Sequence, residues 1–183
     1  FEKVSTITAL IFYSFPTQWF GLMLLLIFAG KLGWFPSGGR EDIFAGAEGF
    51  SHLLDIAHHA VLPVVTLGLV LYADYTLIVR SAMLETLGED YVLTARAKGL
   101  PRRRIVWRHA FRNASLPIVQ LVVLSLAFVV GGSILVETVF SWPGVGLEFY
   151  EALGANDWPL LNGLTLVSVV AIGFVRTFAT RAS

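Results

Sequence analysis

The sequence has no cysteine and little charge. Of its 183 residues, 14% are charged and 56% are hydrophobic, with a mean hydropathy of +0.73, whereas a soluble domain is about 25% charged. The missing cysteines exclude disulfides, a cysteine-ligated zinc site and a thiol nucleophile. The low charge excludes an ordinary cytosolic enzyme. Acidic and basic residues number 13 each, so no net field attracts nucleic acid, and we expect no nucleic-acid partner.

Short catalytic motifs are also missing. The sequence has no Gly-x-x-x-x-Gly-Lys-Ser/Thr for phosphate binding, no His-Glu-x-x-His and no Gly-x-Ser-x-Gly. His58 and His59 are adjacent, but neighbours on a helix diverge by about 100° and cannot both face one metal ion well. We therefore expect no catalytic residues, no metal site, no cofactor in this chain and no hydrolysis of ATP by it.

What the sequence does contain is long apolar runs. Crossing about 30 Å of hydrocarbon takes about 20 helical residues. The first and third runs carry no charged side chain, whereas the second contains Asp74. We predict an all-α fold, a polytopic bundle of transmembrane helices in a single domain over residues 1–183, with proline bends that neighbouring helices can accommodate. The predicted spans are 4–30, 56–79, 114–136 and 158–175, and the bends lie at Pro16, Pro63 and Pro117.

The basic residues are concentrated in one connection. Residues 80–113 carry eight, whereas 31–55 carry Lys31 and Arg40 and 137–157 carry none. Because Lys and Arg are retained on the cytoplasmic side, we predict that 80–113 lies inside and that the other two connections lie outside. The eight are Arg80, Arg96, Lys98, Arg102, Arg103, Arg104, Arg108 and Arg112.

The inner connection is patterned as two helices. Thr86 and Glu89 fit a capping box that would start a helix. Gly99 fits the left-handed position after a helix end, and Pro101 fits the first turn of a second helix.

That second helix carries Arg104, Arg108 and Arg112 along one stripe. Arg102, Arg103 and Arg104 crowd its first turn, where the helix dipole disfavours cations. Either anionic lipid headgroups or an acidic protein partner can offset that cost, and the residues themselves leave both open.

The segment from Glu89 to Leu100, continuing to His109, Asn113 and Pro117, closely resembles the cytoplasmic EAA loop of ABC importer permeases of the dipeptide, oligopeptide and nickel branch. Leu32-Gly33-Trp34-Phe35-Pro36, Glu137-Thr138-Val139-Phe140 and Pro143-Gly144-Val145-Gly146 are similar to the same branch.

The resemblance implies a permease subunit in a bacterial or archaeal cytoplasmic membrane. It implies six spans, of which this chain holds the last four and lacks the N-terminal part. The basic tail from Arg176 departs from the family, so we expect that the native C-terminal end is also missing. The implied partners are a second permease subunit, two cytoplasmic ATPase subunits that bind the ATP, and an extracytoplasmic solute-binding protein, besides the lipid bilayer. The implied docking residues for the ATPase are Glu89, Asp90, Tyr91, Thr94, Ala95, Arg96, Ala97, Lys98, Gly99 and Leu100.

Two matters stay open at this point. The solute can be a peptide, nickel or another small molecule, and the substrate-binding residues are unknown. Asp74 is the one carboxylate within a predicted span, and an ionisable group in hydrocarbon suggests function by default. The alternative function is therefore an ion-coupled secondary transporter that uses Asp74.

Overall fold

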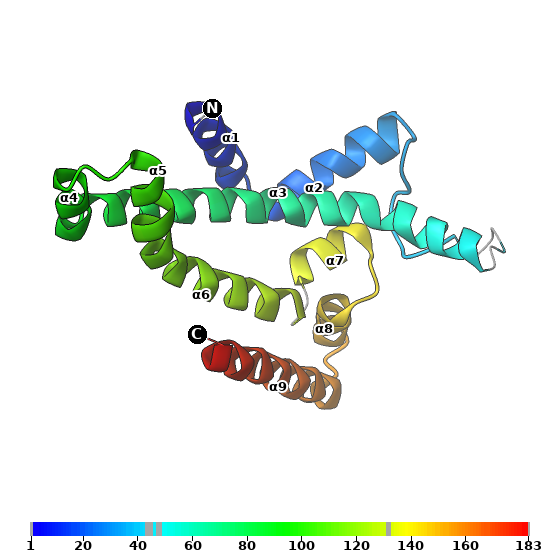
Figure 1. Cartoon of the computed structure of the whole chain (residues 1–183). Coiled ribbons are helices and arrows are strands. Elements are labelled where there is room, and N and C mark those ends of the chain that lie inside the picture. Colours follow the sequence, from blue (N-terminus) through cyan, green and yellow to red (C-terminus); the bar gives the residue numbers. More distant parts are fainter. Residues whose placement is uncertain (1, 43–45, 47–48, 131–132, 183) are drawn as a thin grey trace.

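The computed structural model describes residues 2–42, 46, 49–130 and 133–182, and the described part of the chain is helical, without strands (Figure 1). The all-α prediction is confirmed. Helix α3 (Phe50–Gly88) has 39 residues and forms the axis of the molecule. At about 1.5 Å per residue it is far longer than a bilayer core is thick.

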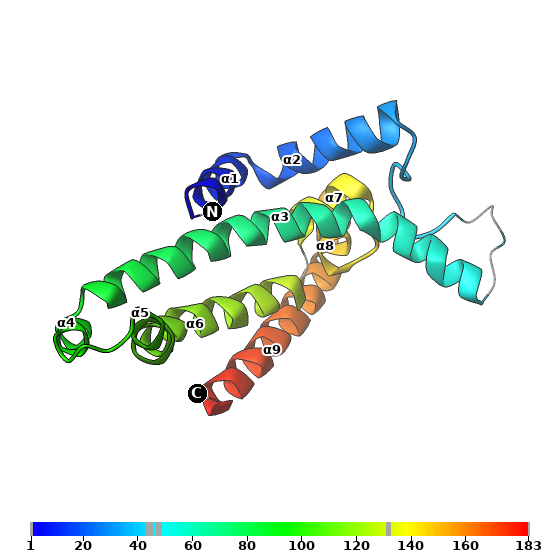
Figure 2. The same cartoon turned by 45° about the horizontal axis from the view of Figure 1, so that its top comes forward.

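The other helices are layered on α3. Helix α1 (Glu2–Ser14) lies against α3, and so does α2 (Thr17–Leu24), which continues as the π-helix η1 (Leu25–Lys31). On the other side, α6 (Phe111–Val130) contacts α3, and α9 (Trp158–Ala182) contacts α6 (Figure 2). Polar contacts fix α1 on the later half of α3: Ser5 shares a 3.0 Å hydrogen bond with Tyr72, and Arg80 donates to Thr6.

The predicted span 4–30 is not one straight helix. The chain breaks between Ser14 and Thr17, and the two halves are bent by 98°. Pro16 sits at the break with extended backbone, φ −59° and ψ 134°, because it has no N–H for an intrahelical hydrogen bond. Pro63 and Pro117, by contrast, lie inside continuous helices.

The predicted span 114–136 also divides. Helix α6 ends at Val130, and a separate short helix, α7 (Ile134–Phe140), begins after Ser133. It is followed by α8 (Val145–Gly154). Residues 134–136 therefore belong to α7, whose Val136 and Phe140 join Leu62 of α3 in the main apolar cluster.

Length and composition support a smaller number of spans than the sequence predicted. Among the described residues, α3 alone is long and apolar enough to cross a membrane, and the bent pair α1 and α2–η1 passes the same test together. The apolar parts of α6 and α9 are shorter, Pro117–Leu126 and Trp158–Phe174. The four-span arrangement stays a prediction.

Candidate functional site

The predicted docking residues lie on one short helix at the far end of α3 and in the turns at its two ends. Helix α4 (Asp90–Ala97) follows α3 after a single linking residue, Glu89. The chain then turns at Gly99 into α5 (Arg102–Arg104), the π-helix η2 (Ile105–Ala110) and α6, which run on without a break. The two-helix pattern predicted for this connection is therefore present, although its first nine residues, 80–88, are part of α3.

The predicted capping box at Thr86 and Glu89 is wrong. Thr86 lies in the last turn of α3, where its hydroxyl donates to the Ala82 carbonyl at 2.8 Å. Glu89 has extended backbone, φ −69° and ψ 147°, and takes the N-cap position of α4 without a side-chain hydrogen bond. A threonine hydroxyl can bond back to the carbonyl four residues earlier as readily as it can cap, and here it does the former.

The left-handed turn at Gly99 is confirmed. Its φ is +75°, and the turn carries both hydrogen bonds of a Schellman motif: Gly99 N–H donates to the Arg96 carbonyl at 2.9 Å, and Leu100 N–H to the Ala95 carbonyl at 3.3 Å. These bonds satisfy carbonyls at the end of α4. Pro101, predicted in the first turn of the second helix, lies just before it as the N-cap.

A small apolar cluster holds α4 against η2. Val92 and Ala95 are buried with Ile105, and Leu87 and Leu100 pack around them. Asn113 of α6 adds a polar link by donating to the Tyr91 hydroxyl at 2.8 Å. The turn and both helices therefore form one packed unit, which we call the coupling loop and define as residues 89–113.

Ala95 is buried inside the coupling loop, although it was predicted on the docking surface. Its side chain is only 6% exposed and faces Ile105. Its smallness allows α4 to lie close to η2 and does not open the outer surface. Ala97, two residues later, is exposed as predicted.

The outward face of α4 lies opposite Val92 and Ala95. It comprises Asp90, Leu93, Thr94 and Ala97, all of them exposed. Leu93 was not among the predicted docking residues, although it is 52% exposed. Burial of positions 92 and 95 against Ile105 turns position 93 outward, and this packing is not visible in the sequence of α4 alone. Glu89, Tyr91, Arg96, Lys98 and Gly99 are exposed around this face, and Leu100 is half-buried.

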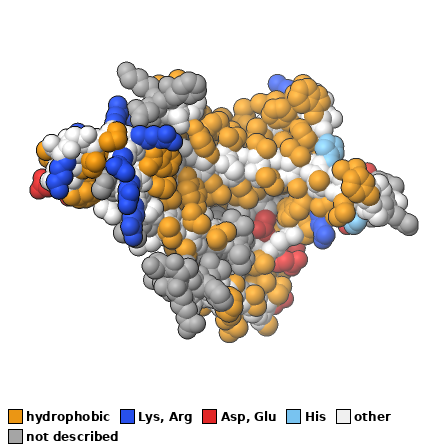
Figure 3. Space-filling model, viewed as in Figure 1, with side chains coloured by type: hydrophobic (Ala, Val, Ile, Leu, Met, Phe, Trp, Pro, Cys, Tyr) orange, Lys and Arg blue, Asp and Glu red, His pale blue; other side chains and the backbone are white. Residues whose placement is uncertain are grey.

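The basic residues gather at this same end of the molecule. Figure 3 shows Lys and Arg side chains grouped over the end of α3 with α4 and α5, while Asp and Glu side chains are mostly found toward the other end. Arg102, Arg103 and Arg104 are all exposed. The coupling loop thus combines a rigid core with an outward face on α4 and a basic face on α5 and η2.

The other singled-out residues lie away from the coupling loop. Asp74 is half-buried in the middle of α3. His58 Nε2 is hydrogen-bonded to the Trp34 carbonyl at 2.9 Å, while His59 Nδ1 lies 3.2 Å from an Asp55 carboxylate oxygen. The two histidines thus have separate partners, as expected of neighbours on one helix.

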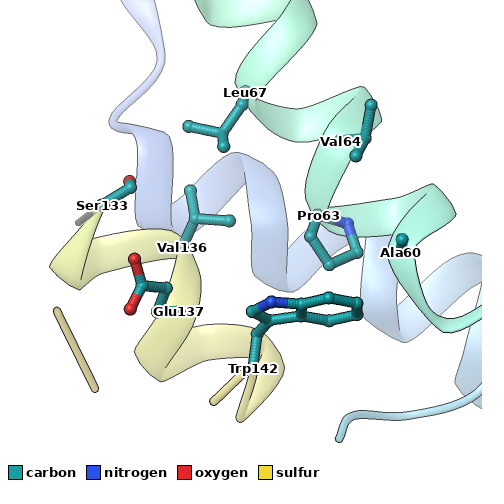
Figure 4. A pocket seen from close by; sticks show the side chains of 8 residues that line it. All are labelled: Ala60, Pro63, Val64, Leu67, Ser133, Val136, Glu137 and Trp142. Carbon is teal, nitrogen blue, oxygen red and sulfur yellow. The ribbon is translucent and has the colours of Figure 1, made fainter. Parts of the chain in front are cut away.

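A cavity of about 220 Å³ lies near the opposite end, between α3 and α7 (Figure 4). Ala60, Pro63, Val64 and Leu67 line it from α3, and Ser133, Val136, Glu137 and Trp142 from the chain around α7. The wall is apolar except for Ser133 and the Glu137 carboxylate.

Glu137 joins α7 to α8. Its Oε2 accepts hydrogen bonds from the backbone N–H groups of Gly146 at 2.8 Å and Leu147 at 3.0 Å. These are N–H groups of the first turn of α8, which have no partner within the helix. The start of α8 can lie this close to α7 because residue 146 is glycine: a Cβ on Gly146 would lie 2.7 Å from the Ile134 nitrogen. A carboxylate at this position also complements the helix dipole.

We predict that Glu137→Ala loosens α8 from α7. Two charge-assisted hydrogen bonds are lost, which costs about 1–3 kcal/mol. Hydrogen exchange should therefore speed up at the amides of Gly146 and Leu147. Glu137→Gln keeps one acceptor oxygen, so its exchange rates should lie close to those of the wild type. Glu148→Ala, an exposed change on α8 itself, should exchange at the wild-type rate. Unchanged exchange in Glu137→Ala would show that the carboxylate does not hold α8.

Comparison with known proteins places the chain in a family. Residues 1–182 match the model of the binding-protein-dependent transport system inner membrane component. The di/tripeptide transport system permease protein DppB of Pseudomonas aeruginosa is 41% identical over 180 residues, covering 89% of this chain and 54% of that protein. The oligopeptide transport system permease protein AppB of Bacillus subtilis is 37% identical, covering 91% of this chain and 52% of its own length.

The dipeptide transport system permease protein DppB of Escherichia coli K12 is 36% identical, covering 96% of this chain and 57% of its own length. The chain thus spans about half the length of the curated relatives that it matches. Because the family model covers almost every residue, the chain belongs to the family of binding-protein-dependent transport system inner membrane components.

Proposed function

We propose that this chain is part of the permease subunit of an ATP-driven importer and that it contributes to the membrane path of a peptide. The observation that carries the proposal is the match to the family over residues 1–182. The names of the relatives, which are permeases for dipeptides, tripeptides and oligopeptides, support a peptide as the solute.

In this proposal the outward face of α4 receives a cytoplasmic ATPase subunit. Three features support it. The face is exposed and slim, with Thr94 and Ala97 as its small residues. It includes an exposed leucine, Leu93, that a protein partner can bury. The packed cluster below it joins α4 to Leu87 of α3 and to Ile105 of η2. Asn113 of α6 is also hydrogen-bonded to Tyr91 of α4, so that movement of α4 is passed to two long helices.

The remaining partners in this proposal are those that the family resemblance implies. Two ATPase subunits bind and hydrolyse the ATP. Apolar side chains cover the outer surface of α9, including Leu166, Val169 and Phe174, which suits contact with lipid and with a second permease subunit. A solute-binding protein delivers the peptide from outside, as the family description implies.

We further propose that the coupling loop is cytoplasmic and that the connection 137–157 is extracytoplasmic, within a multi-pass arrangement. The charge asymmetry of the connections supports this orientation. In a cysteine-free full-length subunit, Arg103→Cys should stay unlabelled by a membrane-impermeant maleimide in intact cells and react once the cells are opened. Glu151→Cys, exposed on α8, should react in intact cells. Labelling of Arg103→Cys in intact cells would reverse the orientation.

Peptide uptake into vesicles tests the function itself and its rival. The reconstituted importer, with its ATPases and binding protein, should take up a labelled dipeptide when ATP is supplied and no ion gradient is present. Asp74→Asn should keep most of this uptake, because a half-buried position on α3 suits a polar contact that an amide can also make. Uptake driven by an ion gradient without ATP, and abolished in Asp74→Asn, would support the secondary transporter instead.

A further inference from the structure

The coupling loop has a second face that the docking of an ATPase on α4 does not use. A shallow surface hollow of about 470 Å³ lies over α5 and η2, lined by Pro101, Arg103, Arg104 and Trp107. Both arginines are exposed, and Trp107 is 64% exposed. A large aromatic side chain left open beside arginines marks this hollow as a candidate binding surface.

The hollow faces away from α4. Ile105 is buried against Val92 and Ala95 of α4. Residues two positions from Ile105 lie about half a turn around the axis in both the α-helical and the π-helical part, so Arg103 and Trp107 occupy the opposite side. An ATPase seated on the outward face of α4 therefore leaves this side of η2 uncovered.

The same side continues as an apolar stripe along α6. The rings of Trp107 and Phe111 are 5.3 Å apart. Phe111 is the first residue of α6, and the exposed residues Val119, Val122 and Leu126 lie within about 80° of it around that helix. The stripe runs into the apolar part of α6, Pro117–Leu126. Along this surface, charge gives way to aromatic rings and then to aliphatic side chains.

That order matches one leaflet of a bilayer. Tryptophan is enriched at the membrane interface, with aliphatic side chains deeper and arginine at headgroup level. The guanidinium groups of Arg103 and Arg104 can each make paired hydrogen bonds to phosphate oxygens. The cytoplasmic leaflet also holds anionic lipids, which attract basic residues at its surface.

We propose that the hollow formed by Pro101, Arg103, Arg104 and Trp107 binds the headgroup of an anionic phospholipid of the inner leaflet, whose acyl chain lies along Phe111 and the stripe on α6. The proposal rests on the cytoplasmic placement of the coupling loop. It divides the loop between two partners, with protein on α4 and lipid on α5 and η2. The lipid neutralises the arginines in the first turn, where the helix dipole disfavours cations.

Bromine-labelled lipids test this proposal, because bromine quenches tryptophan fluorescence at short range. The assembled importer is reconstituted with unlabelled phosphatidylcholine and a rising fraction of phosphatidylglycerol or phosphatidylcholine brominated high on the acyl chain. Subtracting the signal of Trp107→Phe isolates Trp107 from the other tryptophans. We expect brominated phosphatidylglycerol to quench Trp107 at a much lower mole fraction than brominated phosphatidylcholine does.

Charge variants show whether the hollow gives this preference. Arg103→Gln with Arg104→Gln should weaken the preference for phosphatidylglycerol by on the order of 30-fold, since each basic residue near an anionic surface contributes about 5-fold. Arg108→Gln with Arg112→Gln is the matched control: it removes the same charge from exposed positions on η2 and α6 that do not line the hollow and should keep the preference.

Three results would overturn the proposal. Equal quenching by the two lipids would mean that the surface meets lipid without selecting a headgroup. The absence of quenching by either would mean that protein, such as the second permease subunit, covers it. Equal losses in both double variants would mean that net charge alone acts. None of these readouts requires peptide transport, so a failure of the proposed transport function would not be mistaken for a failure of the lipid site.

Discussion

Gly99→Val is expected to separate the permease from its ATPase subunits. Gly99 has a φ of +75°, and the left-handed conformation costs a residue with a Cβ about 1–2 kcal/mol, with a β-branched side chain among the least tolerant. The space around Gly99 is open, so the strain comes from the backbone alone. Relieving it requires the Schellman turn to open, which turns α4 away from the orientation that docking needs.

The measurement is the amount of ATPase that co-purifies with the detergent-extracted importer, together with peptide-stimulated ATP hydrolysis. We expect both to fall at least tenfold in Gly99→Val. Gly88→Val is the matched control: Gly88 also has open space around it, but its φ is not positive. Normal ATPase content and hydrolysis in Gly99→Val would show that the geometry of this turn does not govern docking.

The turn at Gly99 was predictable because its signals are local. A glycine follows a run of helix formers and precedes Leu-Pro, and glycine is the residue that adopts a positive φ without a steric penalty. The Schellman hydrogen bonds form within six residues, so no distant contact is needed to specify them. The all-α class was predictable for a similar reason, since long apolar runs in lipid must satisfy their backbone groups within the segment.

The helix boundaries were less predictable because the same side chains serve two structures. Thr86 can cap a helix or bond back to a carbonyl, and the good helix formers before it let α3 continue to Gly88. The end of α6 did have a local signal, because Gly131 and Gly132 follow Val130 in the sequence and paired glycines favour a helix end; the predicted span 114–136 nevertheless runs across them. Val136 lies in α7 because, with Phe140, it packs on Leu62 of α3, a contact between residues more than seventy positions apart.

Which side of α4 faces outward could not be predicted from α4 alone, because it depends on the packing of α4 against η2. The small residues Ala95 and Ala97 look alike in sequence, yet Ile105 buries the first and leaves the second exposed. The same packing turns Leu93 outward, and the predicted docking residues omitted it. A helix of eight residues is too short for its hydrophobic period to define one face alone, so the cluster with η2 decides which side a partner meets.

Leu93→Ser is expected to weaken ATPase binding by about fourfold to tenfold while leaving the coupling loop folded. Leu93 is 52% exposed and lies outside the cluster of Val92, Ala95 and Ile105, so the change leaves that cluster intact. Burying the exposed half of this leucine at an interface is worth about 0.8–1.5 kcal/mol, and the serine forfeits most of this. Docking should then require more ATPase subunit, which a titration of purified ATPase onto the permease would measure.

A second variant separates docking from folding. Val92, the neighbour of Leu93, is fully buried in the cluster with Ala95 and Ile105, so Val92→Ser should open the coupling loop itself and speed hydrogen exchange across α4. Leu93→Ser should leave that exchange at the wild-type rate and change only the affinity. If Leu93→Ser bound the ATPase as tightly as wild type, the outward face of α4 would not be the surface that the ATPase covers. If it instead matched Val92→Ser in exchange, Leu93 would be part of the loop's own core.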